Sequence, residues 1–343
     1  MPYKFFSSSK KAWQAMYQAI ESANESVYLE MYIFEENLQD FDFLKLLKEK
    51  AKSGVRVRVV LDYFGSFNLS NTSIAELRAS GAELFFLSYF LHRTHRKILI
   101  VDESIAFVGG VNFNKLAWTW DDLVVRVKGK LVRSIIRSFA KVYAESGGKD
   151  PLIIAQRKRI ILDKTRAWLV EHFPVRKHLS LKKLYKKYLG EAEKSIALVT
   201  PYFMPKRWFI GVLHQAALRG IRVEVLVPKK TDYFFLDRVN YFYMYKLTKL
   251  GIKFYLEPKM NHAKVMIIDS DQGMVGSNNL DFLSFEWNSE VGIFLKDKDA
   301  VGKLSEIVGE WRKGATLFDS SEYKPKLFDY ILSPIFRLFT SIF

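Results

Sequence analysis

The chain has 343 residues, of which 49% are apolar, so it can form one large domain or two ordinary ones with packed cores, and an intrinsically disordered protein is excluded. It contains no cysteine, which excludes disulfide bonds and thiolate metal sites. Its formal net charge of +16 favours polyanionic partners such as nucleic acid, an anionic membrane surface or phosphorylated substrates. A solvated basic surface without a partner is the alternative.

Helices and strands are expected to alternate along the chain. Apolar residues at helical spacing predict helices, and β-branched or alternating apolar runs predict strands. In the first part, helices are expected over residues 12–23, 46–54 and 74–81, and strands over residues 26–34, 55–62 and 82–87. The same order returns later, with helices over residues 181–194, 211–220 and 241–251 and strands over residues 195–203, 221–228 and 252–256.

The two series of elements are separated by a nearly constant distance, which predicts a tandem duplication. The matching landmarks are Ser26 and Ser195 (169 residues apart), Gly54 and Gly220 (166), Gly81 and Gly251 (170), His95 and His262 (167), and Asn112 and Asn279 (167). Each half should be an α/β unit with helices packed on a mixed sheet. Between them, Gly147, Gly148 and Pro151 interrupt the pattern and predict a boundary near residues 147–165. The expected domains are residues 1–150 and 151–323, followed by a tail over residues 324–343.

The strongest repeated signal is "HRKILIVDESIAFVGGVN" from His95 and "HAKVMIIDSDQGMVGSNN" from His262. Both copies have the order His-x-Lys, four residues, Asp, six residues, Gly and then Asn. The apolar runs after each His predict strands, so the His and Lys of one copy share a face. Asp102 and Asp269 should point the other way and are interpreted as structural residues.

Each copy offers an imidazole, an ammonium and a carboxamide, which together suit half of a phosphate site. The ammonium groups are those of Lys97 and Lys264, and the carboxamides are those of Asn112 and Asn279; Ser277 is a further candidate phosphate contact. Two such halves facing each other would place two histidines across one phosphorus. One could attack and the other protonate the leaving oxygen, without a metal or other cofactor. The remaining histidines, His92, His172, His178 and His214, are interpreted as packing or surface residues.

At these residues the chain resembles the phospholipase D superfamily, which is marked by paired His-x-Lys-x4-Asp motifs. Within that superfamily it is most similar to the bacterial cardiolipin synthases, through segments such as "VYLEMYIF", "VTPYFMP" and "GSNNLDFLSFEWNSEVGIF". It departs from that group in having Leu283 where an Arg usually precedes the Ser, and in lacking hydrophobic membrane segments at its start.

The resemblance implies both a fold and a mechanism. Two tandem phospholipase D-like α/β sandwich domains should be related by a pseudo-twofold axis, with the active site at their interface. By analogy with related enzymes, His95 would attack the phosphodiester to form a phosphohistidine, and His262 would act as general acid and then base. Glu290 matches a family carboxylate that orients a histidine from behind, and Asp122 lies at its counterpart.

Two segments are candidates for contact with lipid. The C-terminus, "KPKLFDYILSPIFRLFTSIF", predicts short amphipathic helices that lie on an anionic membrane surface, with packing on the protein's own core as the alternative. The aromatic segment "TDYFFLDRVNYFYMYKL" is either part of the core or a contact with lipid. No segment approaches the ~20 apolar residues needed to span a bilayer.

The leading hypothesis is therefore a cardiolipin synthase-type phosphatidyltransferase that uses two phosphatidylglycerol molecules and releases glycerol. It would be peripheral or monotopic on the cytoplasmic face of the cell membrane, with anionic phospholipids (phosphatidylglycerol and cardiolipin) as partners and no nucleic acid. The alternatives are a phospholipase D that hydrolyses phospholipids to phosphatidic acid, a metal-independent nuclease of the same superfamily, and an inactive scaffold that binds anionic lipid.

Overall fold

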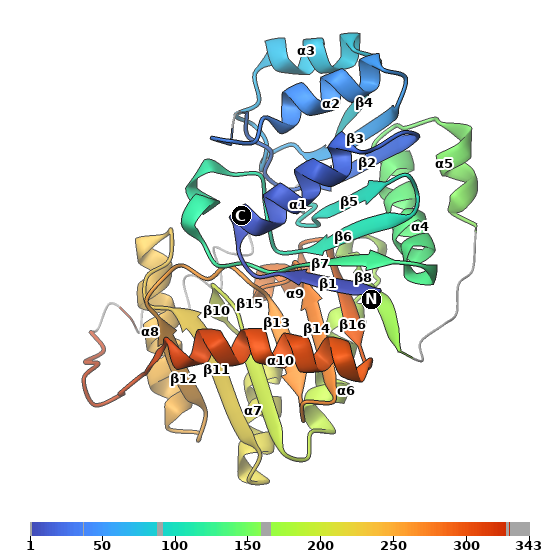
Figure 1. The fold of residues 1–343 in the computed structure, drawn as a ribbon. Helices are drawn as coiled ribbons and strands as arrows, with labels where there is room; N and C mark the ends of the chain where they lie inside the picture. The colour runs from blue at the N-terminus through green and yellow to red at the C-terminus, as the bar shows by residue number, and fades with distance from the viewer. Residues whose placement is uncertain (1, 37, 88–91, 159–165, 327–328, 330–343) are drawn as a thin grey trace.

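Two large β-sheets, one from each half of the chain, form the centre of the protein (Figure 1). The computed structural model describes residues 2–36, 38–87, 92–158, 166–326 and 329. The sheets have seven and eight strands and pack against each other; most helices cover their outer faces, and the helices over Lys130–Glu145 and Lys298–Lys313 join the core between the halves. The predicted fold class, two tandem α/β halves, is confirmed.

The strand order is the same in both sheets. The first runs β1-β7-β6-β5-β2-β3-β4, and the second runs β8-β16-β14-β13-β9-β11-β12, with β17 added at its end. Strands of the first half are β1 (Tyr3–Phe6), β2 (Ser26–Met31), β3 (Arg56–Asp62), β4 (Glu83–Leu87), β5 (Ile98–Val101), β6 (Ile105–Gly109) and β7 (Val124–Lys128). Those of the second half are β8 (Ala167–His172), β9 (Ser195–Val199), β11 (Arg222–Pro228), β12 (Lys253–Glu257), β13 (Val265–Ile268), β14 (Gln272–Gly276), β16 (Glu290–Leu295) and β17 (Thr316–Leu317). A separate two-stranded sheet consists of β10 (Phe203–Met204) and β15 (Leu280–Asp281).

The main helices, like the strands, occur in the same order in the two halves. Those of the first half are α1 (Ser9–Glu21), α2 (Phe43–Lys52), α3 (Asn71–Ala79), η1 (Lys115–Thr119), α4 (Lys130–Glu145) and α5 (Pro151–Gln156). Those of the second half are η2 (Pro174–Arg176), α6 (Ser180–Gly190), α7 (Arg207–Leu218), α8 (Phe234–Thr248), α9 (Phe282–Glu286) and α10 (Lys298–Lys313). Helix α4 contacts β8 of the second sheet, and α10 contacts β1 of the first, so each half reaches across to the other.

The two motif strands are buried on both faces, which explains why their sequences are continuously apolar rather than alternating. In β5, Ile98 and Ile100 belong to the core between the two halves, whereas Leu99 packs in the core beneath α1, α2 and α3. In β13, Val265 belongs to the central core and Met266 to the core beneath α6, α7 and α8. Burial on both faces fixes these strands firmly, and with them the residues that immediately precede them.

Strand β8 begins immediately beyond residues 147–165, where the sequence predicts the boundary, and α5 packs against α4 of the first half. The division at residues 150 and 151 stays a prediction. Most of the predicted amphipathic tail, residues 327–343 other than Asp329, lies outside the described residues. In the part of the chain that the structure describes, no helix combines the length and apolar character that crossing a bilayer requires.

Candidate active site

The two His-x-Lys pairs lie in extended segments that lead directly into β5 and β13. His95 and His262 are each 6% exposed, and Lys97 and Lys264 are more deeply buried. Between His95 and Lys97, the Arg96 side chain donates to Ser138 Oγ at 2.8 Å, on helix α4. Side chains therefore alternate between the two faces of this segment, as expected of an extended chain. Both His-x-Lys pairs lie just before their strands and not within them.

Each histidine is paired with a carboxylate from the other half of the chain. Nδ1 of His95 lies 3.0 Å and 3.1 Å from the carboxylate oxygens of Glu290, at the start of β16. Nδ1 of His262 lies 2.8 Å from Oδ2 of Asp122, just before β7. This crossed arrangement means that neither half contains a complete histidine–carboxylate pair. Reciprocal contacts of this kind are what a twofold arrangement of the halves produces.

Backbone hydrogen bonds across the interface set the register of both pairs. The N–H of His95 donates to the carbonyl of Ser289 at 2.9 Å, and the N–H of His262 donates to the carbonyl of Asp121 at 2.7 Å. Thr94 and Ser289 form one isolated parallel bridge, and Asp121 and Asn261 form the equivalent one. Each carboxylate therefore follows directly after a residue that is bonded to the opposite histidine segment.

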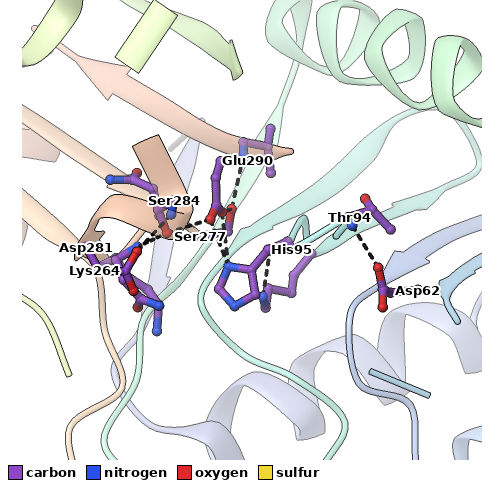
Figure 2. A network of polar contacts seen from close by, with 12 residues as sticks. Asp62, Thr94, His95, Lys264, Ser277, Asp281, Ser284 and Glu290 are labelled. Atoms are coloured by element: carbon purple, nitrogen blue, oxygen red, sulfur yellow. Dashed lines mark hydrogen bonds and ion pairs between the residues drawn. The ribbon is translucent and has the colours of Figure 1, made fainter. Parts of the chain in front are cut away.

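The two carboxylates are supported differently. Glu290 is fully buried and accepts hydrogen bonds from two hydroxyl groups, those of Ser277 and Ser284, the latter at 2.8 Å (Figure 2). Asp122 instead accepts the N–H of Leu123 at 2.7 Å. The position equivalent to Ser277 is Gly110, where an added Cβ would lie only 2.4 Å from Asp122 Oδ1. In the first half, glycine at position 110 leaves room for the Asp122 carboxylate, whereas in the second half the Ser277 hydroxyl donates to Glu290.

Both lysines fold back on their own histidine segments. Nζ of Lys97 donates to the carbonyl of His95 at 2.7 Å, and Nζ of Lys264 donates to the carbonyl of His262. Lys97 also lies 5.0 Å from the ring centre of Tyr32. The ammonium groups are thus held beside the imidazoles, where two positive charges can neutralise a phosphodiester.

Burial and the lysine charges decide the protonation of the site. Burial, followed by the charges of Lys97 and Lys264, lowers the pKa of His95 well below its ordinary value. Burial, followed by Lys264, lowers the pKa of His262 to about 4, with Lys97 contributing in the same direction. Both lysines therefore act on both histidines, and together with burial they favour the neutral form of each imidazole.

Burial shifts the other charged groups as well. It lowers the pKa of Lys97 well below its ordinary value and that of Lys264 to about 8, because an ammonium group loses its hydration in the interior. Burial raises the pKa of Glu290 to about 7, although Lys97 opposes this shift. Shifts of this size cluster at functional sites.

The motif aspartates lie at the far ends of the hairpins, away from the histidines. Asp102 and Asp269 each adopt a positive φ, 49° and 53°, in the turn after their strand. The carboxylate of Asp102 accepts the N–H groups of Asn24, Glu25 and Ser26 at 2.8–3.2 Å. That of Asp269 accepts the equivalent groups of residues 193–195 at 2.7–2.9 Å. These bonds lower the pKa of both aspartates, outweighing burial, which by itself would raise it.

The motif asparagines lie in the loops that follow β6 and β14, and both are buried. Asn112 is fixed by Trp13, whose Nε1 donates to its carbonyl at 2.9 Å. Asn279 donates its N–H to Ser284 Oγ at 3.0 Å, which connects it to the Glu290 network. Their role as phosphate contacts stays a prediction. Of the other histidines, His172 is fully buried with Nε2 3.1 Å from the carbonyl of Phe285, as a packing residue would be.

Sequence reasoning missed the residues that surround the histidines. The ring of Tyr32 lies edge-on to His95 at 4.8 Å, and that of Tyr202 lies edge-on to His262 at 6.4 Å. Asp62 is also buried and accepts the N–H of Thr94 at 2.8 Å, which fixes the residue before His95. The duplication itself carried the signal for the tyrosines, because they are 170 residues apart, close to the offset of the motifs.

This geometry can perform covalent transfer of a phosphoryl-linked group. A carboxylate on Nδ1 fixes the tautomer of each imidazole, so that Nε2 is the nitrogen that reacts. One imidazole can attack a phosphodiester and the other can protonate the leaving oxygen, while the two ammonium groups hold the phosphate. Among the described residues, no three His, Cys, Asp or Glu side chains come together in a way that could hold a metal ion.

Known proteins with similar sequences point in the same direction. The family described as "Cardiolipin synthase, PLD-like domain" matches residues 16–143 and 185–311, one segment in each half. A cardiolipin synthase of Geobacillus kaustophilus is 30% identical over an alignment of 347 positions, which covers 94% of this chain and 68% of the relative. Cardiolipin synthase 2 of Bacillus cereus is 31% identical over an alignment of 356 positions, which covers 97% of this chain and 69% of the relative.

A solved structure matches over nearly the whole fold. The phosphatidylserine synthase of Haemophilus influenzae superposes with a TM-score of 0.77 at 14% identity, covering 99% of this chain and 93% of that protein. At this identity the likeness concerns the fold alone, including the arrangement of the two halves.

Proposed function

From the premise that the chain belongs to the family described as cardiolipin synthase, PLD-like domain, we propose that it is a phosphatidyltransferase that makes cardiolipin from phosphatidylglycerol. The observation that carries the proposal is the crossed pairing of His95 with Glu290 and of His262 with Asp122 in one site. This pairing supplies two oriented imidazoles, which is what a two-step transfer through a covalent intermediate needs.

In the first step, Nε2 of His95 attacks the phosphorus of one phosphatidylglycerol. The bond between phosphorus and the glycerol oxygen breaks, and protonated His262 gives its proton to that oxygen, so that glycerol leaves. The phosphatidyl group remains on His95, while Lys97 and Lys264 balance the charge on the phosphoryl oxygens. Asn112, Asn279 and Ser277 lie in the adjoining loops as further candidate contacts.

In the second step, a glycerol hydroxyl of another phosphatidylglycerol attacks the phosphohistidine. Neutral His262 accepts the hydroxyl proton, the bond between phosphorus and Nε2 of His95 breaks, and cardiolipin forms. If water took the place of this alcohol, the product would be phosphatidic acid, so the acceptor alone separates transfer from hydrolysis.

The low pKa of His262 in the free site has a consequence for the first step. A neutral His262 cannot protonate the leaving oxygen, and its pKa is lowered partly by Lys264 and Lys97. A bound phosphodiester anion offsets these two positive charges and so raises the pKa of His262. Substrate binding thereby favours the protonated acid that the step requires.

The partners and location follow from the same chemistry. Phosphatidylglycerol and cardiolipin are anionic lipids, and a chain with a net charge of +16 is attracted to the surface that contains them. We place the protein peripherally on the cytoplasmic face of the cell membrane, without a nucleic acid partner.

The test incubates purified protein with phosphatidylglycerol vesicles and, separately, with DNA, and identifies products by mass spectrometry. Cardiolipin together with equimolar glycerol supports the proposal. Phosphatidic acid without cardiolipin would show that the protein hydrolyses phospholipids instead. Cleaved DNA beside intact lipid would show that it is a nuclease.

Variants then test the roles within the site. His95→Ala should abolish turnover, because it removes the nucleophile, and His262→Ala should accumulate a phosphatidyl adduct on His95 that peptide mapping can locate. His214→Ala is the matched control, since this histidine lies on α7 in the outer helical layer. Turnover that survives loss of both His95 and His262 would refute the assignment.

A further inference from the structure

Two segments beside the active site present unusually exposed aromatic side chains. Tyr63, Phe64 and Phe67 follow β3, and Tyr233, Phe234 and Phe235 begin α8; these six residues are called the aromatic face. Phe67 is 72% exposed and Phe234 is 78% exposed. Single exposed apolar residues are common on proteins, but two aromatic clusters at equivalent positions of both halves, after β3 and after β11, call for a functional explanation.

The first cluster is built directly onto the His95 side of the site. Ser66 donates its hydroxyl to the carbonyl of Tyr32 at 2.9 Å, and the backbone at Gly65 packs so tightly there that an added Cβ would lie 2.2 Å from the same oxygen. The Tyr32 ring in turn lies 4.8 Å from the ring of His95. The exposed segment is therefore one aromatic ring away from the proposed nucleophile.

The second cluster bears the same relation to His262. The ring of Tyr233 lies 6.4 Å from that of Tyr202, which lies 6.4 Å from that of His262. Tyr202 donates to Asp232, the residue before Tyr233, so this segment is fixed to the site by a hydrogen bond as well. Each cluster is therefore connected through one tyrosine ring to the histidine of its own half.

Basic groups accompany the aromatic rings. The guanidinium of Arg93 lies 3.8 Å above the ring centre of Phe64, and Lys229 and Lys230 are exposed just before the second cluster. Aromatic rings next to Lys and Arg are the combination that suits a membrane interface, where the rings enter the headgroup region and the cations meet anionic lipids.

The end of the described chain leads to the same place. Arg238 on α8 holds Asp329 by two hydrogen bonds of 2.9 Å and 2.6 Å, and Tyr323 donates to the same carboxylate at 3.0 Å. Asp329 is thus held on α8, the helix whose first residues belong to the aromatic face, and the sequence after it is rich in Ile, Leu and Phe.

We propose that the aromatic face docks on the surface of an anionic bilayer and holds both histidines at the level of the lipid phosphates. A lipid phosphodiester could then reach the site without its acyl chains leaving the bilayer. The inference rests on the proposed function for the identity of the lipid, but the docking itself depends only on the surface. The two most exposed rings, Phe67 and Phe234, should contribute most, because they have the most apolar area to bury.

The test compares the Phe67→Ala/Phe234→Ala double variant with Leu218→Ala. Leu218 is 66% exposed but ends α7, which leads into the start of β11, so it lies at the opposite end of that strand from Tyr233. Co-sedimentation with vesicles of phosphatidylglycerol and phosphatidylcholine should show at least a tenfold loss of affinity for the double variant and no loss for Leu218→Ala. Thermal unfolding of all three proteins checks that the fold is retained.

Activity measurements separate this inference from the proposed function. The double variant should lose activity on vesicles in parallel with binding, but act like the unaltered protein on short-chain phosphatidylglycerol dispersed as monomers. Binding unchanged in the double variant would overturn the docking face, and so would an equal loss in Leu218→Ala or a loss caused only by removing residues 330–343. Tighter binding to DNA than to vesicles, with the double variant affecting only the former, would also overturn it. Vesicle binding through the face without turnover of either lipid form would leave docking standing and refute the proposed function.

Discussion

Gly110→Ala is expected to disable the His262–Asp122 pair while the fold remains intact. A methyl group at this position would lie 2.4 Å from Oδ1 of Asp122, and real Cβ atoms essentially never come within 3.0 Å of another heavy atom. The carboxylate must therefore retreat by about 0.6 Å or more, and its 2.8 Å bond to Nδ1 of His262 lengthens to about 3.4 Å, where such bonds are weak. Retreat is hindered because the same carboxylate accepts the N–H of Leu123.

The expected loss of activity follows from the role of such a pair. Displacing a catalytic group by about 1 Å costs roughly 10²-fold in rate, and losing the carboxylate that orients a catalytic histidine costs roughly 10⁴-fold. We therefore expect kcat for cardiolipin formation to fall by about 10²- to 10⁴-fold. The free energy of unfolding should fall by only about 1–3 kcal/mol, as for other overpacked sites.

Steady-state turnover and urea unfolding measure the two quantities, and two variants serve as controls. Gly302→Ala adds a methyl group on α10 where nothing lies within 4 Å, so it should leave turnover unchanged. Ser277→Ala, at the equivalent position of the other half, removes a donor to Glu290 without introducing a clash and should reduce kcat by only about tenfold. Wild-type turnover in Gly110→Ala, or an unchanged low-field imidazole proton of His262 in NMR spectra, would refute the reasoning.

Other consequences concern pH and stability. Burial lowers the pKa of Lys264 to about 8, so its charge is lost as pH rises through that value and kcat/KM for lipid should fall above pH 8. In Lys264→Arg this decline should move to higher pH, because the guanidinium stays charged. A decline at the same pH in the variant would assign it to another group. Glu30 and Arg96 form an ion pair at 2.9 Å with both side chains fully buried, so Glu30→Ala should lower the free energy of unfolding by about 3–5 kcal/mol in urea titrations, because it leaves a buried charge unpaired. A smaller loss, below about 1 kcal/mol, would mean that water reaches the guanidinium.

Much of the fold could be predicted because its strands carry local signals. The runs of Val, Ile and Leu in β3, β5, β11 and β13 are strand-forming wherever they occur, and the constant offset between landmarks predicts two similar halves. The edge strands β1 and β8 were missed. Each is held by pairing with a distant strand, β1 with β7 and β8 with β16, which no local pattern encodes. Strand β8 also follows directly on the stretch interpreted as an interruption, and is in fact the equivalent of β1.

Only those residues of the site that occur in both copies of the motif could be predicted from the sequence pattern. The histidines and lysines are identifiable because each motif occurs twice with one spacing, whereas Glu290 and Asp122 were singled out by family resemblance. Which carboxylate serves which histidine depends on how the halves meet, and that contact has no counterpart in the local sequence. Ser284 was missed for a similar reason: it reaches Glu290 only because α9 turns its hydroxyl inward.

The crossed pairs make the contact between the halves part of the chemistry. Since His95 depends on Glu290 and His262 on Asp122, a sliding of one half by about 1 Å would misplace both carboxylates together. The backbone bonds from His95 to Ser289 and from His262 to Asp121 resist that movement at the residues where it would do most harm. Each half can therefore diverge in its supporting residues, as Gly110 and Ser277 have done, while the register between imidazole and carboxylate stays fixed. Duplication thus supplies two equivalent imidazoles with different supports behind them, and in the proposed mechanism one acts as nucleophile and the other as acid and base.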